Sequence, residues 1–355
     1  DAAGNSYAGI TNATTLNFSS ADVVAPTISS VTSTTANGSY NAGDVIAVTI
    51  TFSEAVTVSG TPQLTLETGD TDAVVNYSSG STGTTLTFNY TVASGNTSGD
   101  LDYASTGALA LNSGTIRDGA GNNATLTLAS PGASNSLGNN KALIVDTTVP
   151  TVSSVTSTTA NGSYNAADVI AITITFSEAV TVSGTPQLTL ETGGTDAVVN
   201  YSSGSIGTTL TFNYTVASGN TSADLGYKTP TALALNSGTI RDATGNNATL
   251  ILASPGAANS LSGSKALIID TTAPTVSSVT STTSDGSYNA SDVIAITIAI
   301  NEAVAVSGTP QLTLETGSSD AVVNYSSRSV GNPSWTATDI DTDADNAMSV
   351  FVADM

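Results

Sequence analysis

Carboxylate and amide side chains recur along this chain at a fixed step of 124 residues. Their oxygens are the ligands that calcium prefers, and a calcium ion takes about six to eight of them. No His or Cys is present, so zinc, thiolate chemistry and imidazole acid–base catalysis lack their usual groups. The sequence therefore offers candidate calcium ligands in three sets: Asp22, Glu54, Asp118 and Asn122; Asp146, Glu178, Asp242 and Asn246; and Asp270 with Glu302.

The same acidic residues are poor candidates for catalysis. Paired carboxylates can hydrolyse glycosides, but here each acid recurs in the copies or lies in a loop near a junction between them. Aromatic residues make up only 5% of the chain, too few for an aromatic-rich sugar cleft. Serine is abundant, but no histidine is present to activate it. We therefore expect no enzymatic activity. We expect calcium as the bound cofactor, in a structural role.

The charge balance narrows the choice of partners. With 28 acidic and 6 basic residues, the net charge is −22. This argues against nucleic acid, which needs clustered Lys and Arg, and against anionic membrane surfaces. No apolar run is long enough to span a membrane. The charge fits a solvated extracellular protein or one that takes up cations, although solubility alone would also explain it.

The 124-residue step marks a tandem repeat. The stretch VSGTPQLTLETG begins at Val58, Val182 and Val306. We predict full copies at residues 26–149 (copy one) and 150–273 (copy two), and an incomplete copy at 274–355 (copy three), which diverges after about Ser329. Residues 1–25 resemble the final strands of a preceding or partner repeat.

Alternation of apolar and polar residues predicts strands throughout each copy. In Val45–Ser53 the even-numbered residues are apolar, and Thr84–Ala93 shows the same pattern. Shorter strands are predicted at Thr27–Thr35, around Leu64 and Leu66, and at Ala73–Tyr77, Thr115–Arg117, Ala124–Leu128 and Ala142–Asp146. No amphipathic helix is evident. The expected fold is all-β, with tandem immunoglobulin-like antiparallel β-sandwiches arranged end to end.

This architecture gives the acidic residues a common location. Short linkers of the form Asp-Thr-Thr-x-Pro join the copies, and proline stiffens them, so successive copies should form a thin rod. The last strand of one sandwich ends beside the top loops of the next. Each recurring set should therefore converge at a junction. A plainer interpretation is that Asp118 and Asn122 only shape a turn and that Asp146 only ends a strand.

Three other features are less specific. Asp100 and Asp102 form an acidic patch that loses one carboxylate in copy two, so a solvated loop is favoured over a metal site. Asp339, Asp341, Asp343 and Asp345 alternate near the C-terminus but lack the glycine and distal glutamate of an EF-hand, which favours disorder or a polar edge. Asn-x-Ser/Thr sequons occur at Asn37, Asn76, Asn89, Asn96 and Asn123, and their glycosylation stays open.

Several motifs point to a family. The runs FSEAVTVSGTPQLTLETG, DLDYAS, GTIRDGAGNNATLTL and KALIVDTTVPT resemble tandem immunoglobulin-like repeats of very large bacterial surface proteins. These include secreted adhesins and repeats similar to those of the cyanobacterial cell-surface protein linked to swimming motility. The resemblance extends to about Ser329. It implies a secreted or surface-anchored stalk, often stiffened by calcium at its junctions.

The expected function is thus a stiff extracellular rod for cell-surface adhesion. Its partners would be neighbouring repeats or identical subunits, with surface glycans or proteins as further candidates. The alternative is a subunit of an extracellular filament. In that case a segment around Ala13–Val24 of one subunit would complete copy three of the next by donor-strand complementation.

Overall fold

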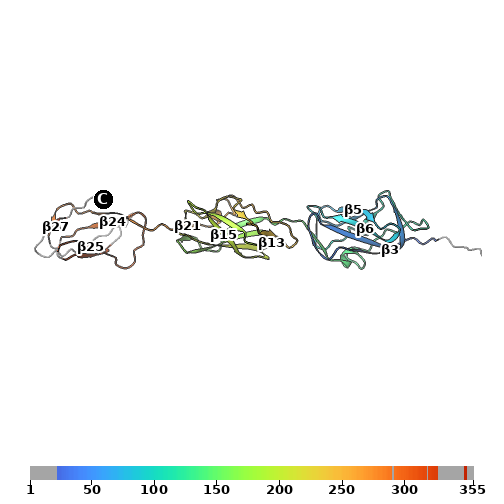
Figure 1. The fold of residues 1–355 in the computed structure, drawn as a ribbon, viewed down its shortest axis with the longest axis horizontal. Helices are drawn as coiled ribbons and strands as arrows, with labels where there is room; N and C mark the ends of the chain where they lie inside the picture. Colours follow the sequence, from blue (N-terminus) through green and yellow to red (C-terminus); the bar gives the residue numbers. More distant parts are fainter. Residues whose placement is uncertain (1–21, 290–291, 318, 327–347, 350–355) are drawn as a thin grey trace, which may run out of the picture. The chain divides into compact units, whose positions relative to one another are not determined.

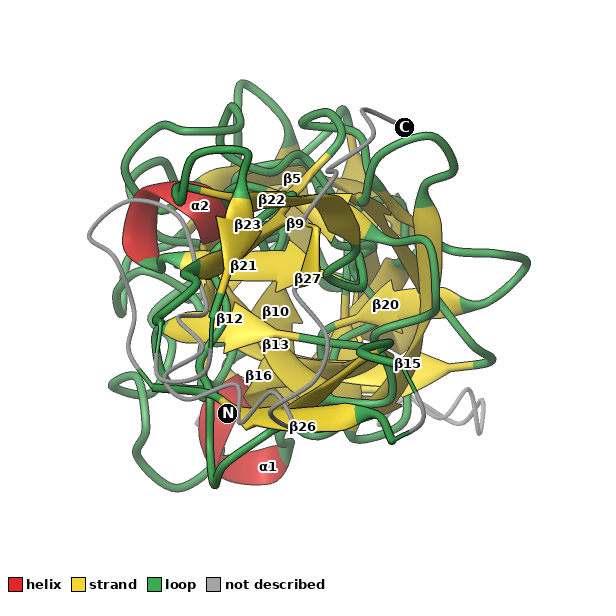
Figure 2. Ribbon diagram, turned by 90° about the vertical axis from the view of Figure 1, so that its left-hand side faces the viewer, coloured by secondary structure: helices red, strands yellow, loops and turns green. Residues whose placement is uncertain are grey.

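The computed structural model describes residues 22–289, 292–317, 319–326 and 348–349, and these residues form an almost entirely β protein (Figures 1 and 2). Strands account for 47% and helices for 3%, which confirms the all-β prediction. By their packing the residues fall into two compact units. Among the described residues, the first unit holds 22–216 and 222–269, and the second holds 217–221 with those from 270 onward.

Copy one contains a large and a small sheet. The large sheet has the order β1-β3-β6-β5-β4-β8, with β9 paired to β3, and the small one has the order β2-β10-β7. The elements are β1 (Ile28–Ser33), β2 (Gly38–Tyr40), β3 (Val45–Ser59), β4 (Gln63–Leu66), β5 (Ala73–Ser79), β6 (Gly83–Thr91), β7 (Thr97–Ser98), β8 (Leu109–Ala110), β9 (Thr115–Arg117), α1 (Leu137–Asn140) and β10 (Leu143–Asp146).

Copy two repeats this layout one step of 124 residues further along. Its sheets have the orders β11-β13-β16-β15-β14-β18, with β19 and β20 attached, and β12-β21-β17. The elements are β11 (Val152–Ser157), β12 (Gly162–Tyr164), β13 (Val169–Ser183), β14 (Gln187–Glu191), β15 (Ala197–Ser203), β16 (Gly207–Thr215), β17 (Thr221–Ser222), β18 (Gly226–Tyr227), β19 (Leu233–Ala234), β20 (Thr239–Arg241), α2 (Leu261–Ser264) and β21 (Leu267–Asp270).

The alternating pattern places one face of each long strand in the core. Ile46, Val48 and Ile50 are fully buried, and Leu86 and Phe88 from β6 lie in the same cluster. Copy two forms a separate core from the equivalent residues. The largest contribution to stability is the burial of these side chains, at about 1.5–3 kcal/mol each. Each core is built within one copy.

The described part of copy three forms shorter sheets. β22 (Val276–Ser281) pairs with β24 (Ile296–Ile300), β23 (Ser287–Tyr288) with β27 (Met348–Ser349), and β25 (Gln311–Leu314) with β26 (Ala321–Asn324). Val279 is 48% exposed, whereas its counterparts Val31 and Val155 are fully buried. In copy one, Val31 donates its N–H to the carbonyl of Asn135, just before α1.

The structure departs from the predicted elements in several places. β3 continues to Ser59 because the chain crosses a register shift between Thr51 and Val56 and then pairs with β9. The strand predicted at Ala124–Leu128 is wrong, since only isolated bridges occur there, at Asn123 and Thr125. β2 and β10 pair in parallel, so the sheets are not purely antiparallel. α1 and α2 are single turns, each capped by a serine side chain.

Two predictions lie outside the described residues. The C-terminal aspartates Asp339, Asp341, Asp343 and Asp345 are among them, as is most of the proposed donor segment around Ala13–Val24. Of residues 1–25, the structure describes only 22–25. Within the described residues, neither helix has the length or hydropathy to cross a membrane.

Candidate metal centre

The fold brings together one acidic residue from each of three segments at the start of copy one, and likewise at the start of copy two. In copy one, Glu54 lies in β3 where the strand leaves β6, between the paired residues Thr51 and Val56. Asp118 begins the loop after β9, and Asp22 lies in the segment that leads into copy one. The register shift leaves Glu54 outside the β3–β6 pairing.

The loop after β9 is organised by the carboxylate of Asp118. Its Oδ1 accepts the N–H groups of Ala120 at 2.9 Å and Asn122 at 2.8 Å, and its Oδ2 accepts the Asn122 amide Nδ2 at 2.7 Å. Asp242 does the same for Asn246 in copy two. The turn-forming role considered for these residues is therefore present. It also fixes the Asp118 carboxylate, which is only 6% exposed.

The asparagine of this loop also holds the incoming chain. Asn122 Nδ2 lies 3.0 Å from the carbonyl oxygen of Asp22 and 3.4 Å from that of Val24. Asn246 Nδ2 donates to the carbonyl of Asp146 at 3.0 Å. The same contact thus occurs on both sides of copy one, and in each case it sets an aspartate beside the loop.

The result is two clusters of three carboxylates, which we call the junction triads. The first consists of Asp22, Glu54 and Asp118, and the second of Asp146, Glu178 and Asp242. In each triad, one carboxylate oxygen from every residue lies within 4.8 Å of the other two. Calcium–oxygen distances of about 2.3–2.6 Å place two ligands on opposite sides of one ion about 4.6–5.2 Å apart. Hard oxygen donors at this separation therefore fit calcium.

The glutamate of each triad carries an electrostatic strain. Burial, followed by the charges of Asp22 and Asp118, raises the pKa of Glu54 above its usual 4.5. Burial and the charges of Asp146 and Asp242 raise the pKa of Glu178 in the same way. The Oε1 atom of Glu178 is buried and makes no hydrogen bond. A bound cation would offset the repulsion between the carboxylates and would give the Glu178 Oε1 atom a partner.

The aspartates of the loop behave oppositely. Burial alone would raise the pKa of Asp118, but the hydrogen bonds from the side chain and backbone of Asn122 and from the next backbone N–H groups outweigh it and lower the pKa. Asp242 has a lowered pKa for the same reason, with an added bond from the Thr244 hydroxyl. Each triad therefore pairs an aspartate whose pKa is lowered with a glutamate whose pKa is raised.

The third predicted set, Asp270 with Glu302, forms no group of three acidic residues among the described residues. Asp270 Oδ1 accepts the N–H of Thr272 at 3.0 Å, and Glu302 has a buried Oε1 without a hydrogen bond. No third acidic residue joins them in the part of the chain that the structure describes. The position equivalent to Asp118 and Asp242 would fall at 366, beyond the sequence.

The prediction of a solvated loop at the D-L-D-Y patch is wrong for Asp102. This residue is 8% exposed, and its Oδ2 accepts the N–H of Gly132 at 2.9 Å. Its Oδ1 accepts the N–H of Tyr103. The buried Asp102 carboxylate thus holds the loop that contains Gly132. Asp100, by contrast, is exposed as expected. The sequence could not indicate this, because the partner lies 30 residues away.

A further junction contact was not predicted. Asn41 Nδ2, in the turn between β2 and β3, donates to the carbonyl of Thr244 at 3.2 Å, which joins copy one to the Asp242 loop of copy two. Thr244 stands where copy one has Ala120. The acceptor is a backbone carbonyl, which every residue type offers, so the side-chain difference gave no signal for this contact.

The sequons differ in the state of their asparagines. Asn37, Asn76, Asn96 and Asn123 each accept a hydrogen bond through Oδ1, from Ala142, Gln63, Tyr90 and Arg117 respectively. Asn89 is exposed, and its side chain makes no hydrogen bond within the described part of the chain.

The chain matches no protein-family model, no curated protein and no solved structure.

Proposed function

We propose that the chain is an extracellular structural protein, a stiff stalk of immunoglobulin-like β-sandwiches in a cell-surface adhesin, with calcium ions locking the junctions between copies. The observation that carries the proposal is the repetition of the junction triad. The same three acids, held by the same asparagine contact, occur at the start of copy one and at the start of copy two. Such repetition suits a mechanical element and is hard to reconcile with one asymmetric active site.

The second triad explains how an ion would act mechanically. Asp146 ends β10 of copy one, whereas Glu178 and Asp242 belong to copy two. An ion shared by these carboxylates would bind the end of one copy to the top of the next. Because the ligands come together only in the folded junction, calcium would stabilise it by mass action. Extracellular modules of this type bind calcium at about 10⁻⁴ to 10⁻³ M, which suits an extracellular setting.

The first test compares the full chain in calcium and in a chelator. We expect calcium to raise the unfolding temperature and to increase the maximum dimension measured by small-angle X-ray scattering, because the junctions stiffen. Glu54→Gln and Glu178→Gln should each abolish one calcium-binding event in titration calorimetry. Asp70→Asn is the matched control, since Asp70 is an exposed carboxylate outside both triads. Equal dimensions with and without calcium would refute the proposed role.

The filament subunit is the second candidate, and the exposure of Val279 favours it. This valine is open in copy three where its counterparts are buried, so an added strand would find apolar surface to cover. Electron microscopy of the purified chain over a range of concentrations decides between the two. Filaments would support the subunit, whereas monomers at every concentration would end this alternative and leave the stalk.

A further inference from the structure

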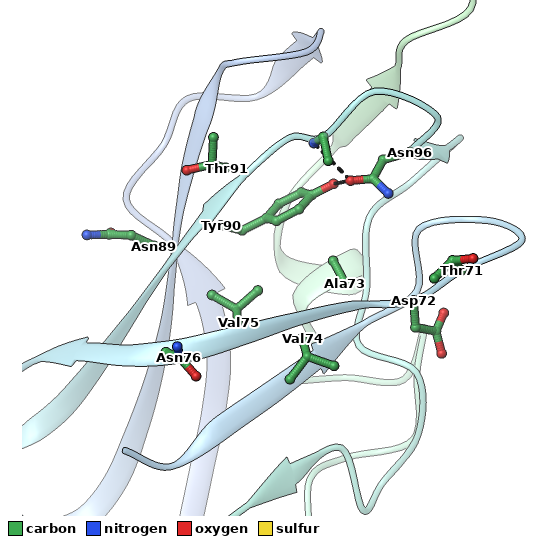
Figure 3. A pocket seen from close by; sticks show the side chains of 11 residues that line it. Thr71, Asp72, Ala73, Val74, Val75, Asn76, Asn89, Tyr90, Thr91 and Asn96 are labelled. Atoms are coloured by element: carbon green, nitrogen blue, oxygen red, sulfur yellow. Dashed lines mark hydrogen bonds between the residues drawn. The ribbon is translucent and has the colours of Figure 1, made fainter. Parts of the chain in front are cut away.

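A groove opens on copy one where β5 and β6 separate (Figure 3). Its volume is about 530 Å³, within the range of ordinary ligand sites. Residues 71–76 line one side, and residues 89–91 with Ala93 and Asn96 line the other. It lies apart from the junction triads, since no residue of either triad is among those that line it.

The strand registers show that the groove is a gap in the sheet. β5 and β6 pair only at Tyr77 with Phe88 and at Ser79 with Thr87. Before Tyr77, β5 pairs with β4, and after Phe88, β6 pairs with β3. The two strands diverge from their last common pair, so each has an edge facing the other across the groove.

Both edges direct backbone groups into the gap. The N–H of Tyr77 donates to Pro62 on the β4 side, so by alternation Val74 turns its N–H and C=O toward β6. The N–H of Val92 donates to Asp44 on the β3 side, so Thr91 turns its groups toward β5. Each of these residues lies three positions beyond the last β5–β6 pair. An extended backbone laid between them would find hydrogen-bonding groups on both sides.

Side chains give the groove an apolar floor and a polar rim. Tyr90 and Val75 are buried beneath it, and the Tyr90 hydroxyl donates to Asn96 Oδ1 at 2.8 Å. Asp72 and Asn89 are exposed at the rim (Figure 3). Alternate side chains of an inserted strand would therefore meet apolar and polar surroundings in turn.

The rim carboxylate is in a different state in the two copies. In copy two, Asp196 Oδ2 contacts Lys228 Nζ at 2.5 Å. In copy one, Ala104 replaces the lysine, and no ion pair joins Asp72 among the described residues. The carboxylate at this position thus binds a lysine ammonium group in copy two, whereas Ala104 offers none to Asp72 in copy one.

We propose that the groove of copy one binds an extended peptide from another protein, paired as a strand between β5 and β6, with a lysine or arginine of the peptide on Asp72. Charge selects this partner over a second copy of the chain, whose net charge is −22. In copy two, the equivalent carboxylate, Asp196, is already paired with Lys228 of the same chain. The inference is independent of calcium binding at the junctions.

The test uses the full chain and two fluorescein-labelled peptides, Thr-Val-Lys-Val-Thr and its counterpart with Glu in the centre. We expect saturable binding of the lysine peptide in fluorescence anisotropy, about twofold to fivefold weaker after Asp72→Asn, as for an exposed ion pair. Ala104→Lys should weaken binding at least as much. Copy two carries lysine at that position, so the substitution is compatible with the fold. Lys228→Ala should leave the copy-one site intact.

Hydrogen exchange then separates strand pairing from simple charge attraction. Saturating lysine peptide should slow exchange in segments 72–77 and 89–93 and leave the junction loops unchanged. Equal affinity for the lysine and glutamate peptides would overturn the proposal. So would wild-type binding by Ala104→Lys, loss of binding in Lys228→Ala, or unchanged exchange in both segments.

Discussion

Copies one and two share a loop glycine whose backbone N–H donates a hydrogen bond to a side chain, but the accepting side chain comes from a different element in each copy. In copy one, the N–H of Gly132 donates to Asp102 Oδ2 at 2.9 Å. In copy two, the equivalent N–H of Gly256 donates to Ser262 Oγ at 3.1 Å. Asp102 becomes Gly226 in copy two, while Ser262 stands where copy one has Gly138. The acceptor has moved from a segment near β7 to the helical turn.

Sterics explain why the two changes come together. A Cβ added at Gly138 would lie 3.0 Å from Asp102 Oδ2, and one added at Gly226 would lie 3.2 Å from Ser262 Oγ. Two acceptor side chains in this space would therefore be in tight contact. The loss of an acid at position 226 is therefore half of an exchange that preserves a buried hydrogen bond. By contrast, the acids of the junction triads are the same in both copies.

The largest difference between the copies should appear when the loop aspartates are removed. Asp242 accepts N–H groups from Thr244, Gly245 and Asn246 and the hydroxyl of Thr244. Asp242→Ala leaves these donors unpaired, so we expect copy two to lose about 3 kcal/mol of stability, the scale of charged hydrogen bonds. Asp118→Ala removes fewer bonds and should destabilise copy one less.

Hydrogen exchange in a chelator measures this, because peptides from β3 and β13 report each copy separately. Calcium is kept out so that only the turn-forming role is read. The matched control is Asp70→Asn, which should change neither copy. Equal destabilisation by the two alanine substitutions would mean that the Thr244 hydroxyl adds nothing.

The next effect tests the exchanged pair. Asp102→Gly leaves the N–H of Gly132 without its acceptor, at an expected cost of about 1–3 kcal/mol to copy one. Adding Gly138→Ser should recover most of that loss, because the double variant recreates the arrangement of copy two. Gly138→Ser alone should destabilise, since the new side chain meets Asp102. Additive effects of the two substitutions in denaturant unfolding would show that the positions are uncoupled.

The sequence predicted local features well and distant partnerships poorly. Alternation identified the buried faces of β3 and β6, because a residue's side in a strand follows from its neighbours. The recurrence of Asp22, Glu54 and Asp118 at the copy spacing identified residues that the fold brings together. Asp102 was misassigned, because its burial depends on a glycine in another loop. The extension of β3 past Thr51 was missed, since a register shift interrupts the alternation there.

The junction glutamates should give the protein an unusual dependence on pH. Their raised pKa means that, as the pH rises above 4.5, the folded chain keeps protons that the unfolded chain releases. Stability in chelator should therefore fall with rising pH. The lowered pKa of Asp118 and Asp242 acts oppositely, and that contribution is lost as the pH falls below 3.8.

Thermal unfolding in chelator between about pH 3 and pH 7 checks the sign, with a maximum expected near pH 4. Calcium should restore stability on the upper side of this maximum, where the glutamates would otherwise be ionised and unpaired. The double variant Glu54→Gln and Glu178→Gln should flatten that side and respond little to calcium. A steady rise in stability toward neutral pH in chelator would show that the triads impose no strain.

The smallest difference concerns the lysine at the rim of the copy-two groove. Its hydrogen bond to Asp196, with the charge of that carboxylate, raises the pKa of Lys228, but the lysine side chain is 55% exposed. Exposed ion pairs contribute little because solvent screens them and ordering the side chains costs entropy. Lys228→Ala should therefore leave the unfolding midpoint of copy two unchanged in denaturant titrations. If it fell clearly, the pair would be structural, and Ala104 in copy one would need a compensating partner, as Gly226 has in Ser262. An unchanged midpoint would mean that the difference between Lys228 and Ala104 matters for the groove and not for the stability of either copy.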